Sequence, residues 1–84
     1  MNFTLKIIKN DKTIQRVRTH SARRFGNSLR TINWKNCPLK VYLKVNYGKH
    51  EDCFGKMTTF YNDGWYDNKE DLWWAFDVFS KEKF

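Results

Sequence analysis

The alternation in LKVYLKVNY, which starts at Leu39, limits what this chain can fold into more than any other feature does. Apolar side chains take every second position from Leu39 to Tyr47, whereas Lys40, Tyr42 and Lys44 lie between them. A period of two is typical of a β-strand, in which neighbouring side chains point to opposite faces. The segment therefore predicts a strand with one covered face and one exposed face.

Three further segments indicate strands. FTLKIIK (3–9) also alternates and TIQRVR (13–18) is rich in β-branched residues, so the two predict a hairpin closed by NDK. CFGKMTTFY (53–61) predicts a fourth strand, separated from the third by a loop at GKHED. The tripeptide Asn62-Asp63-Gly64 is typical of a turn and is expected to follow that strand.

A helical period begins after Ser21, and Ser21, or His20 just before it, can cap the first turn. Apolar residues then recur three or four positions apart, which places them on one stripe of a helix. The inward residues of this helix are expected to be Ala22, Phe25, Leu29 and Ile32.

A second helix is predicted near the end of the chain, in DNKEDLWWAFDVF. Asp67 opens it with Glu70 three residues later, an arrangement typical of a capping box. Trp73 and Trp74 are adjacent and therefore point about 100° apart, so one of them is expected at the edge of the core or outside it. The inward stripe consists of Leu72, Ala75, Phe76 and Phe79.

These elements, in the order ββαββα, predict a small antiparallel sheet of about four strands with two helices, in the α+β class. The 84 residues form one domain, residues 1–84, although such a short chain buries only about 60–65% of its unfolded surface. Aromatic residues make up 18% of the chain, so large rings are expected to supply much of its stability.

The chain shows neither an apolar run long enough to cross a bilayer nor the apolar core of a secretion signal. A cytoplasmic location is therefore expected, with no membrane partner and with Cys37 and Cys53 reduced. A disulfide between these two cysteines is the alternative.

The positive charge lies in the first half of the chain. Residues 1–49 carry twelve lysines and arginines against one acid, and residues 50–84 carry four against eight acids. The halves are thus +11 and −4, which together give the net charge of +7. A polyanion or an acidic protein surface is expected to meet the first half.

The densest basic segment is RVRTHSARRFGNSLR, residues 16–30, which holds five arginines and no acid. It can be a contact surface for a polyanion or only the solvated side of a helix; the lack of any acid favours contact. The expected partner-binding residues here are Arg16 and Arg18 on the strand and Arg23, Arg24, Asn27 and Arg30 on the helix.

A second candidate surface is the exposed face of the strand that starts at Leu39. Lys40, Tyr42 and Lys44 present cations around a ring, as proteins that bind single-stranded nucleic acid do. Lys6, Arg16 and Lys56 from neighbouring strands are expected to extend this surface. The alternative is an exposed sheet face whose lysines limit aggregation.

Trp73 and Trp74 form a third candidate, a possible second interface. Tryptophan is enriched among binding hot spots, and this helix offers more apolar surface than a small sheet needs. Such an interface would allow a homodimer as well as a monomer, whereas the alternative is a core wrapped in large rings.

Chemistry at a metal or a catalytic group is not expected. His50 and Cys53 form one mixed pair, with His20 and Cys37 as distant partners, whereas a structural zinc site normally has two close pairs. The sequence has no nucleophile signature, paired carboxylates or phosphate-binding glycine loop, so we expect neither an enzyme nor a cofactor.

Two functions follow from the basic surfaces. One is direct, weakly sequence-selective binding of DNA or RNA, sensitive to salt. The order of elements resembles parts of double-stranded-RNA-binding domains, except that their final helix meets phosphate with lysines where this chain has DNKED.

The other function is inhibition. In size, element order and lack of motifs the chain resembles small phage or mobile-element inhibitors of the anti-CRISPR kind. That resemblance implies a non-enzymatic protein that blocks a host nucleic-acid-handling complex by occupying an anionic protein or nucleoprotein surface, and it carries over no functional residue. Inhibition is the leading hypothesis from the sequence and direct binding is its alternative.

Overall fold

The computed structural model describes residues 1–35 and 38–82. Four antiparallel strands and two helices follow in the order ββαββα, a small α+β fold. Cys37 lies outside the described residues, and Cys53 is free and exposed. The elements are β1 Asn2–Lys9, β2 Lys12–Thr19, α1 Ala22–Arg30, β3 Leu39–Glu51, β4 Met57–Tyr66 and α2 Lys69–Ser80.

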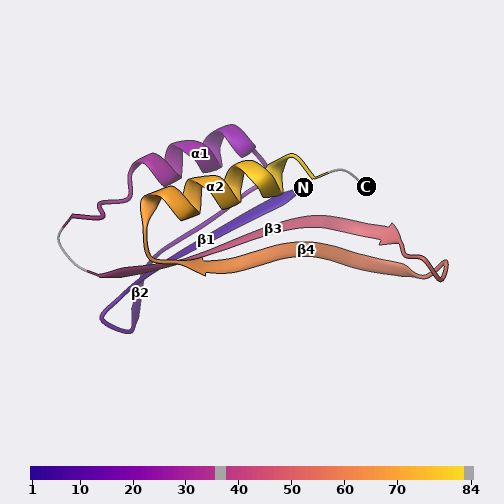
Figure 1. Ribbon diagram of the computed structural model, residues 1–84, viewed down its shortest axis with the longest axis horizontal. Coiled ribbons are helices and arrows are strands. Elements are labelled where there is room, and N and C mark those ends of the chain that lie inside the picture. Colours follow the sequence, from indigo (N-terminus) through magenta and orange to yellow (C-terminus); the bar gives the residue numbers. More distant parts are fainter. Residues whose placement is uncertain (36–37, 83–84) are drawn as a thin grey trace.

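The strands form one sheet in the order β2-β1-β3-β4, and both helices lie on the same face of it (Figure 1). α1 contacts β2 and α2 contacts β3 and β4, so the helices lie side by side over the two halves of the sheet. They run antiparallel, because each follows a strand that ends at the opposite end of the sheet (Figure 1). One face of the sheet is thus covered and the other is open to solvent.

The core lies between the sheet and the helices, and the alternation of β1 and β3 supplies most of it. Phe3 of β1 stacks on Phe25 of α1 with ring centroids 5.2 Å apart, and Phe76 of α2 lies 5.4 Å from Phe25. Such aromatic pairs add about 0.5–1.5 kcal/mol each beyond their buried area. The buried residues are Phe3, Leu5, Ile7, Phe25, Leu29, Leu39, Val41, Leu43, Val45, Tyr47, Leu72 and Ala75.

α1 begins where its capping residue predicts, but the residues that it buries differ from the predicted inward stripe. The hydroxyl of Ser21 accepts a hydrogen bond from the backbone N–H of Arg24 at 3.3 Å. Ala22, expected inside, is exposed, and Gly26 is buried instead. Gly26 faces Phe76 of α2, because the two helices approach each other there.

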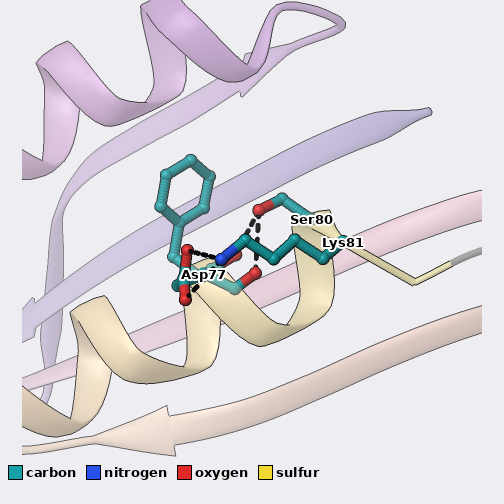
Figure 2. Close-up of polar contacts among 4 residues, drawn as sticks. Asp77, Ser80 and Lys81 are labelled. Atoms are coloured by element: carbon teal, nitrogen blue, oxygen red, sulfur yellow. Dashed lines mark hydrogen bonds and ion pairs between the residues drawn. The ribbon is translucent and has the colours of Figure 1, made fainter.

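α2 begins one residue later than the capping box at Asp67 predicts. Asn68 is the N-cap, and its side-chain oxygen accepts from the backbone N–H of Asp71 at 2.9 Å. At the other end, the hydroxyl of Ser80 donates to the carbonyl oxygen of Phe76 at 2.7 Å (Figure 2). No helix in the described part of the chain is long and apolar enough to cross a membrane.

The α2 residue Asp77 forms an ion pair with Lys81 one turn later, with Nζ 3.0 Å from Oδ1 (Figure 2). Both side chains are largely exposed, so the pair contributes only about 0.3–0.5 kcal/mol to the helix.

The prediction for the second hairpin is wrong in its boundaries. β3 continues through the expected GKHED loop to Glu51, and β4 begins at Met57 rather than at Cys53. The expected turn Asn62-Asp63-Gly64 lies inside β4, paired with Val45, Lys44 and Leu43 of β3. Ladder hydrogen bonds to β3 outweigh the local turn preference of these three residues.

Candidate functional site

The face of the sheet that the helices leave open carries the polar side chains of all four strands. Because Phe3, Leu5 and Ile7 point into the core, Thr4, Lys6 and their cross-strand neighbours point to the other side. We call this surface the open sheet face. It consists of Thr4, Lys6, Ile8, Arg16, Arg18, Lys40, Tyr42, Lys44, Tyr61, Asp63 and Trp65.

The strand register brings cations and rings into one row. Arg16 of β2 pairs with Lys6 of β1, Lys6 pairs with Tyr42 of β3, and Tyr42 pairs with Trp65 of β4. Neighbouring strands are about 4.8 Å apart, so the row spans about 14 Å between the backbones of β2 and β4. In the next row Arg18, Thr4, Lys44 and Asp63 are neighbours in the same way.

The aromatic rings on the open sheet face lie close to one another and to lysines. The rings of Tyr42 and Trp65 have centroids 5.1 Å apart, inclined at 51°. The ammonium of Lys6 lies 5.6 Å from the centroid of Tyr42, and that of Lys44 lies 4.6 Å from that of Tyr61. Trp65 and Tyr61 are 55% and 52% exposed, so large areas of aromatic surface remain open to a ligand.

Positive charge dominates this face. Among the residues of the open sheet face, five cations accompany a single acid, Asp63, and none of the five is in an ion pair within the described residues. The five are Lys6, Arg16, Arg18, Lys40 and Lys44. A hollow of about 320 Å³ lies among them, lined by Thr4, Lys6, Arg16, Val17, Arg18, Tyr42 and Lys44. Two further acids, Asp11 and Asp67, line a hollow of about 550 Å³ together with Lys40 and Trp65.

Asp63 is engaged by Tyr42 rather than by a cation. The phenol of Tyr42 donates to Oδ2 of Asp63 at 2.8 Å. Burial of the ring, together with this hydrogen bond and the charge of Asp63, raises the pKa of Tyr42 to about 12. Tyr42 is therefore neutral at physiological pH and its ring is held in place.

The structure splits the basic surface that the sequence suggests. Arg16 and Arg18 lie on the open sheet face with Lys40, Tyr42 and Lys44, as part of the second candidate surface. Arg23, Arg24, Asn27 and Arg30 are exposed on α1, which covers the opposite face (Figure 1). The strand and helix arginines of residues 16–30, which the sequence groups as one candidate contact surface, therefore lie on two surfaces, because the sheet separates them.

The structure also changes the second and third candidate surfaces that the sequence suggests. Lys56 lies in the turn between β3 and β4, beyond the sheet rows, because β4 begins after it. Trp73 packs against the core, whereas Trp74 is 65% exposed, so of the expected second interface only Trp74 presents its ring to solvent.

Trp65 and Tyr61 are the residues that sequence reasoning missed at this site. In YNDGWY, Tyr61, Asp63 and Trp65 alternate with the inward residues Asn62, Gly64 and Tyr66, which is a strand pattern. The turn signal of Asn62-Asp63-Gly64 masked that alternation.

The histidine and cysteine candidates do not form a site in the described residues. Nε2 of His50 lies 2.8 Å from the backbone carbonyl oxygen of Tyr47, to which it can donate, and the ring lies against Phe60. Within residues 1–35 and 38–82, no group of three or more histidine, cysteine or acidic residues could hold a metal ion.

Comparison of the chain with protein-family models, with curated proteins and with solved structures found no significant match.

Proposed function

We propose that this protein binds single-stranded nucleic acid on the open sheet face. The observation that carries the proposal is the row in which Arg16, Lys6, Tyr42 and Trp65 are cross-strand neighbours. Cations at one end of the row meet the phosphates, and the paired rings at the other end stack on bases. Single strands suit this surface because their bases are free to stack, whereas those of a duplex are not.

The energetics of such a surface have two parts. Stacking of a base on an aromatic ring contributes about 1–3 kcal/mol and depends little on which base is present. Phosphate contacts make the affinity fall with salt, with a slope of roughly −0.7 per phosphate in a plot of log K against log salt concentration. If all five cations each meet one phosphate, the slope is about −3.5.

Fluorescence anisotropy with a labelled deoxythymidine oligonucleotide at several salt concentrations tests the charge part. We expect micromolar affinity at low salt and a steep loss as salt rises. Arg16→Glu with Arg18→Glu should weaken binding at least tenfold and flatten the salt slope. The matched control, Arg23→Glu with Arg24→Glu, makes the same change in net charge on α1 and should have a much smaller effect.

The stacking part is tested with Trp65→Ala, which lies on the same face and carries no charge. It should weaken binding on the order of tenfold without changing the salt slope, because a ring contributes no counterion release. If the charge reversals on β2 and on α1 weaken binding equally, the assignment of the binding surface to the open sheet face is wrong.

Complete absence of binding by the folded protein at low salt would contradict the proposal itself. It would leave the inhibitor hypothesis, in which the same basic residues contact an acidic protein surface of a nucleic-acid-handling complex.

A further inference from the structure

The hairpin of β3 and β4 extends past the rest of the sheet as a two-stranded ribbon (Figure 1). β1 pairs with β3 only as far as Asn46, whereas β3 and β4 remain paired out to Glu51 and Met57. A bulge between Asn46 and Gly48 marks the point where the ribbon leaves the four-stranded sheet. The end of this ribbon, residues 49–58, is called the tip below.

The turn of the tip is organised by one carboxylate. Oδ1 of Asp52 accepts hydrogen bonds from the backbone N–H groups of Phe54 at 2.8 Å and Lys56 at 3.0 Å. The backbone N–H of Asp52 donates to the carbonyl oxygen of Lys56 at 2.8 Å, and Gly55 takes the positive φ of 79° that the turn requires. The backbone donors from Lys56 and Phe54 lower the pKa of Asp52, so the carboxylate stays ionised and the turn stays closed.

This ordered turn exposes an aromatic ring. Phe54 is 85% exposed at the tip, and Met57 beside it is 65% exposed. Turns favour glycine, proline, asparagine, aspartate and serine, so a phenylalanine contributes nothing to the formation of this one. Phe54 is therefore a large apolar side chain on an ordered, projecting turn, available for contact with something outside the molecule.

The chemistry of the tip indicates what that contact is. Its acids Glu51 and Asp52 balance Lys49 and Lys56, so it has little attraction for phosphate. Its apolar surface is about one ring and one methionine, far less than a stable protein interface of roughly 800 Å² on each partner requires. It matches a single base step, into which DNA-bending proteins insert single Phe, Leu, Ile or Met side chains.

The tip also continues the open sheet face. On β4 the side chains of Trp65, Tyr61 and Met57 follow one another at intervals of four residues on the same side of the strand. At about 3.3 Å per residue, successive members are about 13 Å apart, so a strand bound along β4 from Trp65 past Tyr61 reaches the tip.

We propose that Phe54 is a wedge that inserts between stacked bases where a duplex meets the single strand held on the open sheet face. This inference rests on the proposed function and adds the form of its substrate: a junction of single- and double-stranded nucleic acid. The ribbon places the ring beyond the sheet, and the hydrogen bonds to Asp52 order the turn backbone that carries it.

The test compares a single-stranded oligonucleotide with the same oligonucleotide extended by a short duplex. 2-Aminopurine in the first base pair reports unstacking at the junction by an increase in fluorescence. The intact protein should bind the junction more tightly than the single strand and raise the 2-aminopurine signal. Phe54→Ala should lower junction affinity on the order of tenfold and remove the signal. It should leave the single-strand affinity and the salt slope unchanged.

A positioning role for Asp52 is tested separately. Asp52→Ala retains the ring but loses all three hydrogen bonds that the carboxylate accepts, from Phe54, Lys56 and Thr58, so it should lower the junction preference. Asp52→Asn keeps a side-chain acceptor and should restore most of that preference. Trp74→Ala, which removes an exposed ring from α2, is the control and should change neither substrate.

The outcomes separate the two proposals. If Phe54→Ala binds the junction as the intact protein does, or if the 2-aminopurine signal never rises, the wedge is refuted while binding to the single strand still supports the proposed function. If neither substrate binds, both proposals are wrong. A loss of single-strand affinity in Phe54→Ala would also refute the wedge, because it would place Phe54 within the general contact surface.

Discussion

Replacing Asp63 by asparagine should tighten nucleic-acid binding, because it removes a negative charge from the strand rows that carry the cations and rings of the open sheet face. Asp63 lies directly across from Lys44 and accepts the hydrogen bond of Tyr42 at 2.8 Å. Asparagine keeps a side-chain oxygen for that phenol and has nearly the same size. The substitution therefore changes the charge and leaves the geometry of the aromatic row in place.

The expected gain in affinity can be worked out from the spacing of the strands. A phosphate bound over Lys44 or its neighbour Thr4 lies one to two strands away from the carboxylate, about 7 Å at a strand spacing of about 4.8 Å. In water the repulsion between two unit charges at that distance is about 0.6 kcal/mol, which corresponds to about threefold in affinity. At 0.15 M salt the Debye length of about 8 Å reduces the gain to less than about twofold.

Anisotropy measurements at low and physiological salt would detect this difference, and Glu70→Gln on α2 is the control with the same charge change. An NMR titration of the Tyr42 ring gives an independent readout. Since burial, the hydrogen bond and the charge of Asp63 together raise the pKa of Tyr42 to about 12, the substitution should lower that pKa while burial keeps it above the ordinary value. Unchanged or weaker binding, with the pKa lowered as expected, would show that the phosphates do not pass this corner of the sheet.

Three further predictions concern stability. Gly26→Ala should stabilise the protein by up to about 1 kcal/mol, a rise in Tm of about 4–8 °C, because alanine is the better helix former. A Cβ there would lie an ordinary 3.8 Å from Phe76, so a lower Tm by circular dichroism would refute the packing described. Trp73→Ala should cost about 2–4 kcal/mol and Trp74→Ala less than about 0.5 kcal/mol in urea unfolding, because only Trp73 packs against the core; equal losses would contradict this division. The pKa of Tyr42 is raised from 10.0 to about 12, so the contribution of its neutral phenol to folding stability should be fully present below pH 10 and should be lost as the pH rises to about 12. Urea unfolding at pH 8 and pH 11 measures that loss, which Tyr42→Phe should reduce.

The elements that could be predicted are those whose signal lies within a few neighbouring residues. The alternation around Val41 and Leu43 predicts a strand with one buried face, and both residues are fully buried. The hydroxyl of Ser21 predicts the start of α1, because capping is a contact with a backbone N–H three residues away. Of the two adjacent tryptophans, the angle of about 100° between them predicts that one lies outside the core, and Trp74 does.

The candidate site was predictable only in part. Lys40, Tyr42 and Lys44 lie on one strand, so their common face follows from a period of two. Trp65 becomes part of the site only through its pairing with Tyr42, which depends on how β4 aligns with β3 over a distance of 23 residues in the chain. Local turn preference pointed the other way at Asn62-Asp63-Gly64.

The amino-acid sequence by itself determined the strands of the first hairpin, the two amphipathic helices and the excess of positive charge in the first half of the chain. These depend on side-chain periodicity, capping and composition, which are local or additive properties. The tertiary structure alone decided which cations share a surface: pairing across four strands gathered Arg16, Lys6, Tyr42 and Trp65, whereas the arginines of α1 were carried to the opposite side. The physical reason is that a strand sends alternate side chains to opposite faces, so two residues become neighbours only when the register between strands places them together.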